Sequence, residues 1–236
     1  MIDQETEIYA LSESSVTVVF GDEISSLMAE KVSALNSAIH NAPFHGLITT
    51  VPAYATLTVY YAPEEVFYSG LTGESAYQKV SGYLSALPVS KLSKEKSTTL
   101  ITIPVCYGGT HGPDLELVAR HCMLTTDEVI KLHASAAYRV YMIGFIPGFA
   151  YMGGMDTRLS TPRKEHPRTK VNAGSVGIAG NQTGIYPLDI PGGWQIIGQT
   201  PIQLFNAGRP EPSYLKAGDT VRFKPIAIDE FQSQTY

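Results

Sequence analysis

The chain has 236 residues, of which 44% are hydrophobic, 10% aromatic and 17% charged, and this composition excludes disordered, collagen-like and coiled-coil proteins. The net charge of −5 argues against a nucleic-acid-binding protein, which would need a surplus of Lys and Arg. Two cysteines cannot form a disulfide framework, and residues 1–7 are acidic where a secretion signal would be basic, so we expect a cytoplasmic protein.

The first part of the chain, up to Ser97, alternates predicted strands and helices. Alternating apolar residues predict four strands, at residues 8–11, 15–20, 47–51 and 54–61. Apolar residues at helical spacing predict one helix from an N-cap at Asp22 to about Asn41, and another from Tyr77 to Pro88. The resulting order ββαββα indicates a small α+β sandwich.

The composition changes at the polar, lysine-rich segment from Pro88 to Ser97. Up to Ser97 there are 11 acidic and 5 basic residues, whereas the remainder has 11 acidic and 12 basic residues, including all seven arginines. Such a segment is typical of a linker between domains. We therefore predict two domains, residues 1–90 and residues 91–236.

The second domain is predicted to be mostly β. A strand is expected at 101–105, followed by two helices at 115–122 and 127–133, the second opened by a capping box of Thr125 or Thr126 with Glu128. Short apolar runs then recur between Gly and Pro residues, at 175–179, 184–188, 194–198 and 220–226. This spacing predicts a closed or folded-over β structure. The uncharged stretches are too short and too interrupted to span a bilayer, so no membrane segment is expected.

Three segments of this domain are candidates for a binding site. The loop 144–154 carries Phe145, Pro147, Phe149 and Tyr151 among glycines, and it is expected either to line a pocket or interface or to plug one end of a barrel. The run 158–170 has five cationic residues and one Glu, and it is expected either to hold an anionic ligand through guanidinium groups or to be a solvated basic loop. The third segment supplies amide, hydroxyl, phenol and indole groups among glycines, at Gln182, Thr183, Tyr186, Gly192, Gly193 and Trp194. For this segment we favour a ligand site over simple turns.

Other sequence patterns are ambiguous or unfavourable. Asp114 follows a glycine turn and is equally compatible with a site carboxylate and with a helix N-cap. The residue at 173 is Ala where a Gly-x-Ser-x-Gly motif needs glycine, so Ser175 is not expected to be a nucleophile. Cysteine and histidine spacing matches no zinc motif, so no metal site is expected.

Taken together, these motifs resemble the signature of the allophanate hydrolase subunit 1 family, also called the Kip inhibitor family, whose bacterial members include the B component of 5-oxoprolinase. The resembling segments are 107–115 (YGGTHGPDL), 144–151 (GFIPGFAY), 161–163 (TPR), 167–168 (PR), 173–180 (AGSVGIAG), 182–187 (QTGIYP), 191–194 (PGGW) and 198–201 (GQTP). The resemblance covers nearly the whole chain and departs from the family pattern at Asn172 and Gln199.

This resemblance implies an α+β protein with an N-terminal ferredoxin-like sandwich and a C-terminal cyclophilin-like β-barrel. It also implies one component of an ATP-dependent 5-oxoprolinase, which opens 5-oxo-L-proline to L-glutamate. The implied partners are the C component, of the allophanate hydrolase subunit 2 or KipA-like type, and the A component, of the LamB/YcsF-like type. ATP is then a cofactor of the complex, its binding by this chain is left open, and the isolated chain is expected to be inactive. The alternative is a non-catalytic inhibitor of a sporulation histidine kinase, antagonised by the KipA-like partner.

The resemblance also suggests roles for the candidate residues. Asp114, Arg163 and Arg168 become candidate catalytic residues, with the two arginines facing the anionic groups of the reaction. The candidate substrate-binding residues are Phe145, Pro147, Phe149, Tyr151, Gln182, Thr183, Tyr186, Gly192, Gly193 and Trp194, of which Gln182, Thr183 and Tyr186 are expected to contact the lactam ring. If the chain is an inhibitor, the aromatic residues of this set would instead anchor a proline-bearing loop.

Overall fold

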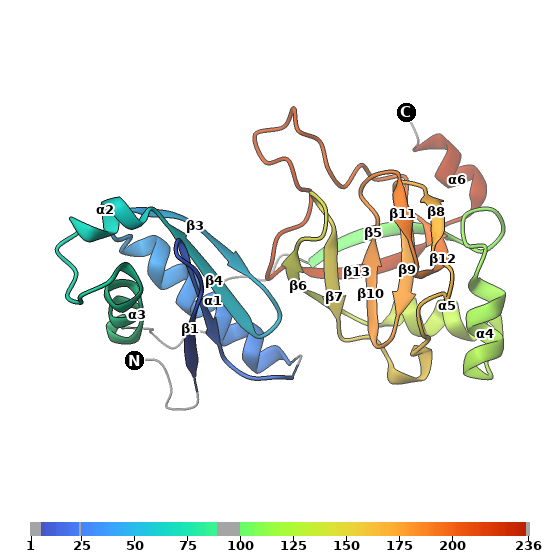
Figure 1. Ribbon diagram of the computed structural model, residues 1–236. Coiled ribbons are helices and arrows are strands. Elements are labelled where there is room, and N and C mark those ends of the chain that lie inside the picture. The colour runs from blue at the N-terminus through green and yellow to red at the C-terminus, as the bar shows by residue number, and fades with distance from the viewer. Residues whose placement is uncertain (1–5, 24, 89–99, 235–236) are drawn as a thin grey trace. The chain divides into compact units, whose positions relative to one another are not determined.

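The computed structural model of the protein describes residues 6–23, 25–88 and 100–234. The chain divides into two compact units, Met1–Lys96 and Ser97–Tyr236, which Figure 1 shows as a sheet with helices and as a barrel. The predicted domain limit between residues 90 and 91 lies outside the described residues. No helix of the described ranges is both long and apolar enough to cross a membrane.

The first unit is an α+β sandwich built on a four-stranded sheet. Its elements in chain order are β1 (Glu7–Ser12), β2 (Ser15–Val19), α1 (Ser26–Asn41), β3 (Leu47–Pro52), β4 (Thr56–Tyr61), α2 (Pro63–Phe67) and α3 (Ala76–Ala86). The strand order is β1-β2-β4-β3, and every neighbouring pair is antiparallel. This is the ferredoxin-like βαββαβ arrangement with its last strand moved to the start of the chain. The predicted α+β class is confirmed.

The core of this unit lies between the sheet and the helices α1 and α3. Alternate residues of the two central strands face it, and they pack against helix residues spaced four apart. The fully buried members are Val16, Val18, Leu57 and Val59 on the strands and Leu35, Ile39, Val80 and Leu84 on the helices. Burial of each side chain contributes about 1.5–3 kcal/mol, which holds the sheet and helices together.

Two local predictions for this unit need correction. The N-cap of α1 is Ser25 and not Asp22, because the extended backbone of Ser25 places its Oγ 3.3 Å from the backbone nitrogen of Met28, which donates to it. Helix α2 was not predicted, because five residues beginning at Pro63 are too few to show helical periodicity.

The second unit is a closed β-barrel with helices. Its elements are β5 (Leu100–Tyr107), α4 (Leu115–Cys122), α5 (Thr126–Ser135), β6 (Tyr138–Ile143), β7 (Ala150–Gly153), the 3-10 turn η1 (Thr157–Leu159), β8 (Arg168–Val171), β9 (Ser175–Ala179), β10 (Gln182–Ile185), β11 (Ile190–Gly192), β12 (Gln195–Gln199), β13 (Thr220–Pro225) and α6 (Ile228–Ser233). The barrel order is β10-β7-β6-β13-β5-β12-β9, and β8 and β11 form a separate small sheet. The predicted closed β structure is confirmed.

One predicted detail of this unit, the start of helix α5, is confirmed, and another, the end of strand β10, is corrected. Helix α5 begins with the expected capping box, in which Thr125 and Glu128 exchange hydrogen bonds between side chain and backbone. The apolar run predicted to reach Leu188 ends as a strand at Ile185. The strand stops there because Pro187, two residues on, has no N–H to donate to a ladder.

The strands β9, β10 and β12 separate two apolar clusters on opposite faces. Ile178 and its register partner Thr183 point into the barrel, where Ile178 joins the main core. Because successive side chains of a strand point to opposite faces, the next pair, Gly177 and Gly184, faces outward. A second cluster lies on this outer face, formed by Phe149, Val171, Ala179, Tyr186, Trp194 and Ile196. The candidate site is built on that cluster.

Candidate functional site

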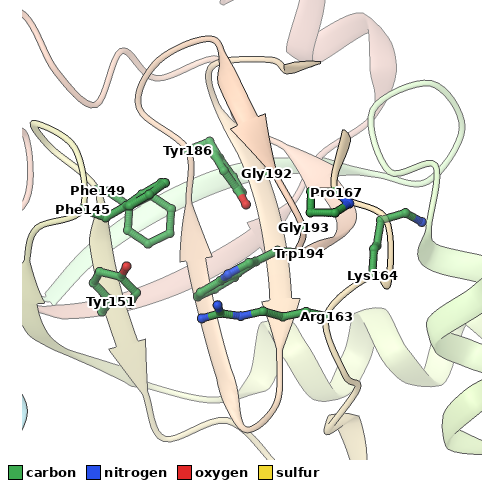
Figure 2. A pocket seen from close by; sticks show the side chains of 10 residues that line it. All are labelled: Phe145, Phe149, Tyr151, Arg163, Lys164, Pro167, Tyr186, Gly192, Gly193 and Trp194. Carbon is green, nitrogen blue, oxygen red and sulfur yellow. The ribbon is translucent and has the colours of Figure 1, made fainter. Parts of the chain in front are cut away.

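A cavity of about 190 Å³ opens on the outer face of the barrel. Its lining comes from β7 and the loop before it, from the segment between η1 and β8, from the residue after β10, and from the end of β11 with the two residues that lead into β12. The lining residues are Phe145, Phe149, Tyr151, Arg163, Lys164, Pro167, Tyr186, Gly192, Gly193 and Trp194, all shown in Figure 2.

Glycines make room for the aromatic rings of this site. A Cβ atom on Gly184 would lie 3.0 Å from Cζ3 of Trp194 and 3.1 Å from Cζ of Phe149. A Cβ atom on Gly192 would lie 2.5 Å from the hydroxyl oxygen of Tyr186. Any other residue at these positions would displace a ring, so the mixture of glycines and aromatics seen in the sequence has a steric cause.

The aromatic wall is centred on Phe149, which is almost fully buried. Its ring centroid lies 4.7 Å from that of Tyr151, 5.3 Å from that of Tyr186 and 5.5 Å from that of Trp194. Edge-to-face and tilted pairs at these distances attract one another beyond simple burial, so the wall is held in one arrangement. The cavity therefore has a preformed apolar surface.

Phe145 stands at the edge of the cavity in an unusual conformation. Its φ is +67°, and 67% of the residue is exposed. A bulky side chain at positive φ is strained, and exposure of a large ring gains nothing for stability. Its ring packs edge-on against Phe149 at 5.8 Å. Strain of this kind tends to mark functional positions.

Positive charge lies beside Trp194, at one side of the aromatic wall. The guanidinium carbon of Arg163 is 6.0 Å from the centroid of the Trp194 ring, a cation–π distance. In Figure 2 the Arg163 side chain extends along the Trp194 indole. No ion-pair partner of Arg163 occurs among the described residues. Its guanidinium is therefore available to an anion entering the cavity.

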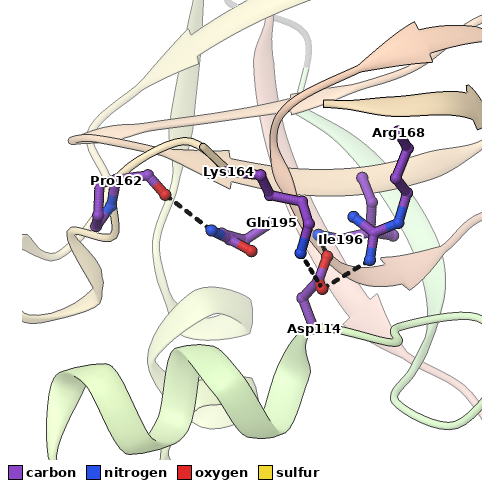
Figure 3. Close-up of polar contacts among 6 residues, drawn as sticks. All are labelled: Asp114, Pro162, Lys164, Arg168, Gln195 and Ile196. Atoms are coloured by element: carbon purple, nitrogen blue, oxygen red, sulfur yellow. Dashed lines mark hydrogen bonds and ion pairs between the residues drawn. The ribbon is translucent and has the colours of Figure 1, made fainter. Parts of the chain in front are cut away.

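Asp114 anchors the basic segment next to the cavity. Its Oδ1 accepts hydrogen bonds from Nη2 of Arg168 at 2.7 Å and from Nζ of Lys164 at 3.1 Å (Figure 3). Its Oδ2 accepts a hydrogen bond from the backbone N–H of Ile196 at 2.7 Å. Burial alone would raise the pKa of Asp114, but these hydrogen bonds outweigh it and hold the pKa below the usual value. The ionised carboxylate thus ties the segment after η1 to strand β12.

The structure does not favour an N-cap function for Asp114. The residue occupies the position before α4, yet its side chain makes no capping hydrogen bond to that helix. Its partners Lys164 and Arg168 are distant in sequence, so this role was not readable from the local pattern.

Burial also affects the two tyrosines of the wall. It raises the pKa of Tyr186, against the opposing effects of a hydrogen bond from the Trp194 backbone and of the Arg163 charge. It raises the pKa of Tyr151 as well, again opposed by Arg163. Both hydroxyls therefore stay protonated at neutral pH.

Most of the predicted site residues meet at this cavity, and some do not. Phe145, Phe149, Tyr151, Arg163, Tyr186, Gly192, Gly193 and Trp194 line it, whereas Asp114, Pro147, Arg168, Gln182 and Thr183 do not. Lys164 and Pro167 were missed, although both lie in the basic run that the sequence had singled out.

The predicted contact of Thr183 with a ligand needs correction, because Thr183 is fully buried inside the barrel. Its hydroxyl donates to the carbonyl of Gly177 at 3.0 Å and lies 2.9 Å from Nε2 of His133. Since that hydroxyl proton is used, His133 donates through Nε2, and its Nδ1 accepts from the Tyr107 hydroxyl at 2.8 Å. Thr183 thus belongs to an internal hydrogen-bond network. The adjacent Gln182 is half-buried at the start of β10.

The remaining predicted residues lie beside the cavity. Pro147 is exposed at the tip of the loop that carries Phe145 and Phe149. Two further cations of the basic run, Arg158 and Lys170, form exposed ion pairs with Asp156 and Asp189. The run therefore divides between the cavity, the Asp114 cluster and solvated pairs. No three His, Cys, Asp or Glu side chains gather as metal ligands within the described ranges.

The similarity to known proteins extends over most of the chain. A family profile described as "Carboxyltransferase domain, subdomain C and D" matches residues 6–215. The chain is 42% identical over 232 residues to the B component of 5-oxoprolinase from Bacillus subtilis (strain 168), with 96% of this chain and 95% of that protein covered. It is 53% identical over 131 residues to the B component of 5-oxoprolinase from Escherichia coli O157:H7, with 56% and 60% covered.

One solved structure similar to this fold is a crystal structure of TTHA0988. The TM-score is 0.78 and the sequence identity is 35%, with 90% of this chain and 40% of that chain covered. The present chain thus spans less than half of TTHA0988 but nearly all of the Bacillus subtilis relative.

Proposed function

The chain belongs to the carboxyltransferase-domain family, subdomain C and D, and we propose that it is the B component of an ATP-dependent 5-oxoprolinase that opens 5-oxo-L-proline to L-glutamate. The similarity to a 5-oxoprolinase B component along almost the full length of both proteins carries this proposal. The partners in the proposal are the C component and the A component of the enzyme, and the complex is cytoplasmic, where ATP is available.

The chemistry of a lactam explains the need for ATP. A lactam carbonyl is a poor electrophile, so the γ-phosphoryl group of ATP is transferred to the carbonyl oxygen and ADP leaves. Water then adds to the same carbon, the C–N bond breaks with the nitrogen taking a proton, and a second water hydrolyses the acyl phosphate to glutamate and phosphate. Negative charge accumulates at each stage, and a nearby guanidinium stabilises it.

Within this reaction the cavity is the proposed contribution of the chain. Arg163 binds an anionic group of the substrate, and the rings of Tyr186 and Trp194 hold the lactam ring. Asp114 and Arg168, which do not line the cavity, act as positioning residues through Lys164. This assignment replaces the catalytic roles that the resemblance suggested for those two residues.

The test is reconstitution. The chain is co-purified with the C component, the A component is added, and glutamate released from 5-oxo-L-proline is measured with and without ATP. We expect ATP-dependent release, reduced by Arg163→Ala by at least about tenfold because a charge-assisted contact is lost. The matched control is Arg158→Ala, which removes an exposed ion pair with Asp156 outside the cavity. If no glutamate is released under conditions that support a known complex, the proposal is wrong, and inhibition of a histidine kinase would then favour the regulatory alternative.

A further inference from the structure

Two neighbouring aromatic side chains of the first unit lie outside its core. Phe67 ends helix α2 and is 60% exposed, and Tyr68 follows it and is 81% exposed. Within the described ranges no other two consecutive residues are both large, hydrophobic and exposed. Exposed rings add nothing to the stability of the unit, so folding does not account for this pair.

The backbone around the two rings is braced by hydrogen bonds. The Ser69 hydroxyl donates to the carbonyl of Val66 at 2.6 Å and accepts from the N–H of Leu71 at 3.3 Å. Lys79, on helix α3 beside α2 (Figure 1), donates through Nζ to the Leu71 carbonyl. Val66 anchors α2, because its side chain is fully buried in the core. The rings are therefore presented from a preorganised turn, which lowers the entropy cost of binding a partner.

Two carboxylates lie on the same side of α2 as the rings. Phe67 comes three positions after Glu64, and Tyr68 three positions after Glu65, which is the spacing of neighbours on a helix surface. Both glutamates are exposed, and neither forms an ion pair within the part of the chain that the structure describes. The chain thus borders the rings with negative charge that it does not pair.

One cation of the chain already lies against these rings. Nζ of Lys79 is 5.9 Å from the centroid of the Phe67 ring, a cation–π distance. The rings of Phe67 and Tyr68 meet edge to face, with their centroids 5.3 Å apart. Two carboxylates against one ammonium group leave this surface negative, and most of Tyr68 is open to a second cation.

We propose that Glu64, Glu65, Phe67 and Tyr68, here called the α2 patch, bind a segment of a partner protein that carries Lys or Arg next to apolar residues. The rings supply apolar anchors and a cation–π face, and the carboxylates pair with the basic side chains. An anionic membrane fits less well, because the carboxylates would face headgroups of the same charge. The α2 patch belongs to the first unit, so this binding does not depend on the reaction proposed for the barrel cavity.

Labelled peptides titrated with the full chain, and followed by fluorescence anisotropy, test the proposal. The probe is an amphipathic peptide of Lys and Leu, and two comparison peptides replace every Lys by Glu or every Leu by Ser. We expect the Lys–Leu peptide to bind with a Kd on the order of 10 μM, because the patch is smaller than a standard interface. Each comparison peptide should bind at least about tenfold more weakly. Raising the salt from about 0.05 M to about 0.5 M should weaken binding about fivefold, because exposed charges are screened.

Variants of the chain locate the binding. The double variant Phe67→Ser, Tyr68→Ser should bind the Lys–Leu peptide at least about tenfold more weakly. The double variant Glu64→Gln, Glu65→Gln should lose most of the salt dependence. The control is Leu27→Ser, which removes an exposed apolar side chain at the start of α1 and should leave binding unchanged. Because all these side chains are exposed, each variant should keep the melting temperature of the parent chain.

Several results would overturn the inference. Failure of the full chain to bind the Lys–Leu peptide would contradict it directly. Equal binding of the Glu–Leu peptide would show that the charge of the partner does not matter, and parent-like binding by the Phe67→Ser, Tyr68→Ser variant would place the peptide elsewhere. If the chain binds vesicles of phosphatidylcholine and phosphatidylglycerol through the two rings, and more tightly than the peptide, the patch is a membrane contact instead.

Discussion

The Oδ1 atom of Asp114 lies 2.7 Å from Nη2 of Arg168, although the two residues are 54 positions apart in the sequence. This pair, shared with Lys164, holds the basic segment against strand β12. In the Asp114→Asn variant two partly buried cations lose their counter-charge, so we expect the free energy of unfolding to fall by about 2–3 kcal/mol. Urea denaturation of the full chain measures this loss.

The control for this variant is Asp156→Asn. Asp156 pairs with Arg158 at 2.6 Å, but the arginine side chain is 62% exposed, so solvent screens the pair. We expect a loss of no more than about 1 kcal/mol. Equal losses in the two variants would show that the Asp114 cluster is not a special anchor.

Two adjacent glycines test the steric account of the cavity. A Cβ atom at Gly192 would lie 2.5 Å from the Tyr186 hydroxyl oxygen, whereas the nearest atom to a Cβ at Gly193 is 3.5 Å away, on Pro167. Gly192→Ala should therefore displace Tyr186 and weaken 5-oxo-L-proline binding, measured by Trp194 fluorescence, by about tenfold or more. Gly193→Ala should leave binding within about threefold of the parent chain, and the reverse order would refute the account.

Met123 gives a prediction for stability alone. It ends helix α4 with a φ of +55° and is 92% exposed, so its side chain is strained and packs against little. Met123→Gly should raise the free energy of unfolding by about 1 kcal/mol, because glycine adopts this conformation without a Cβ clash. Thermal denaturation checks this, and a lower melting temperature would contradict it.

Phe145 has the same kind of strain but lies at the cavity. Asn tolerates positive φ, so Phe145→Asn should leave stability unchanged or raise it by up to about 1 kcal/mol. Unlike Met123→Gly, it should also weaken ligand binding or association with the C component. If neither binding nor association changes, the strain at Phe145 has no functional explanation.

The buried His133 predicts how stability depends on pH. Burial lowers its pKa to about 3 in the folded protein, against about 6.5 in an unfolded chain. Between these values the unfolded chain binds a proton that the folded protein does not, so stability falls as the pH falls, by about 1.4 kcal/mol per pH unit. From pH 7.5 to pH 5 we expect a loss of about 2 kcal/mol, measured by urea denaturation.

Two variants separate this effect from other titrations. His133→Gln should lower stability at pH 7.5, because the Tyr107 and Thr183 hydroxyls lose an ideal partner, and it should flatten the pH dependence. The exposed His121, on helix α4, supplies the control, and His121→Gln should keep the slope of the parent chain. A full slope in His133→Gln would assign the dependence to another group.

Local patterns predicted much of the fold. Helix α4 has the bounds that its apolar spacing indicated, and β9 coincides with the run 175–179. Such elements follow from neighbouring residues, whose periodicity and capping are written in a short stretch of chain. The start of α1 was misplaced because Asp22 and Ser25 are both good N-caps, and local preference does not choose between them.

The sequence predicted some residues of the candidate site but not the contacts that each of them makes. Aromatic and glycine residues that line the cavity were conspicuous in sequence, since such residues in loops need a packing reason. The basic run was conspicuous too, but the sequence did not show which of its cations face the cavity and which pair with carboxylates. Arg163 faces the cavity, while Arg168 turns to Asp114, because Asp114 is brought there by strand β12 and by the turn before α4.

By itself, then, the amino-acid sequence determined the α+β class, the positions of most helices and strands, and the residues among which a site had to be sought. These depend on periodicity, capping and composition, which act over a few residues. Only the tertiary structure decided that Thr183 faces the barrel interior and that Gly184 faces the aromatic rings of the outer cluster. It also decided that Asp114 forms ion pairs with two cations. Those outcomes depend on which strands pair and in what register, and a shift of one residue would exchange the two faces.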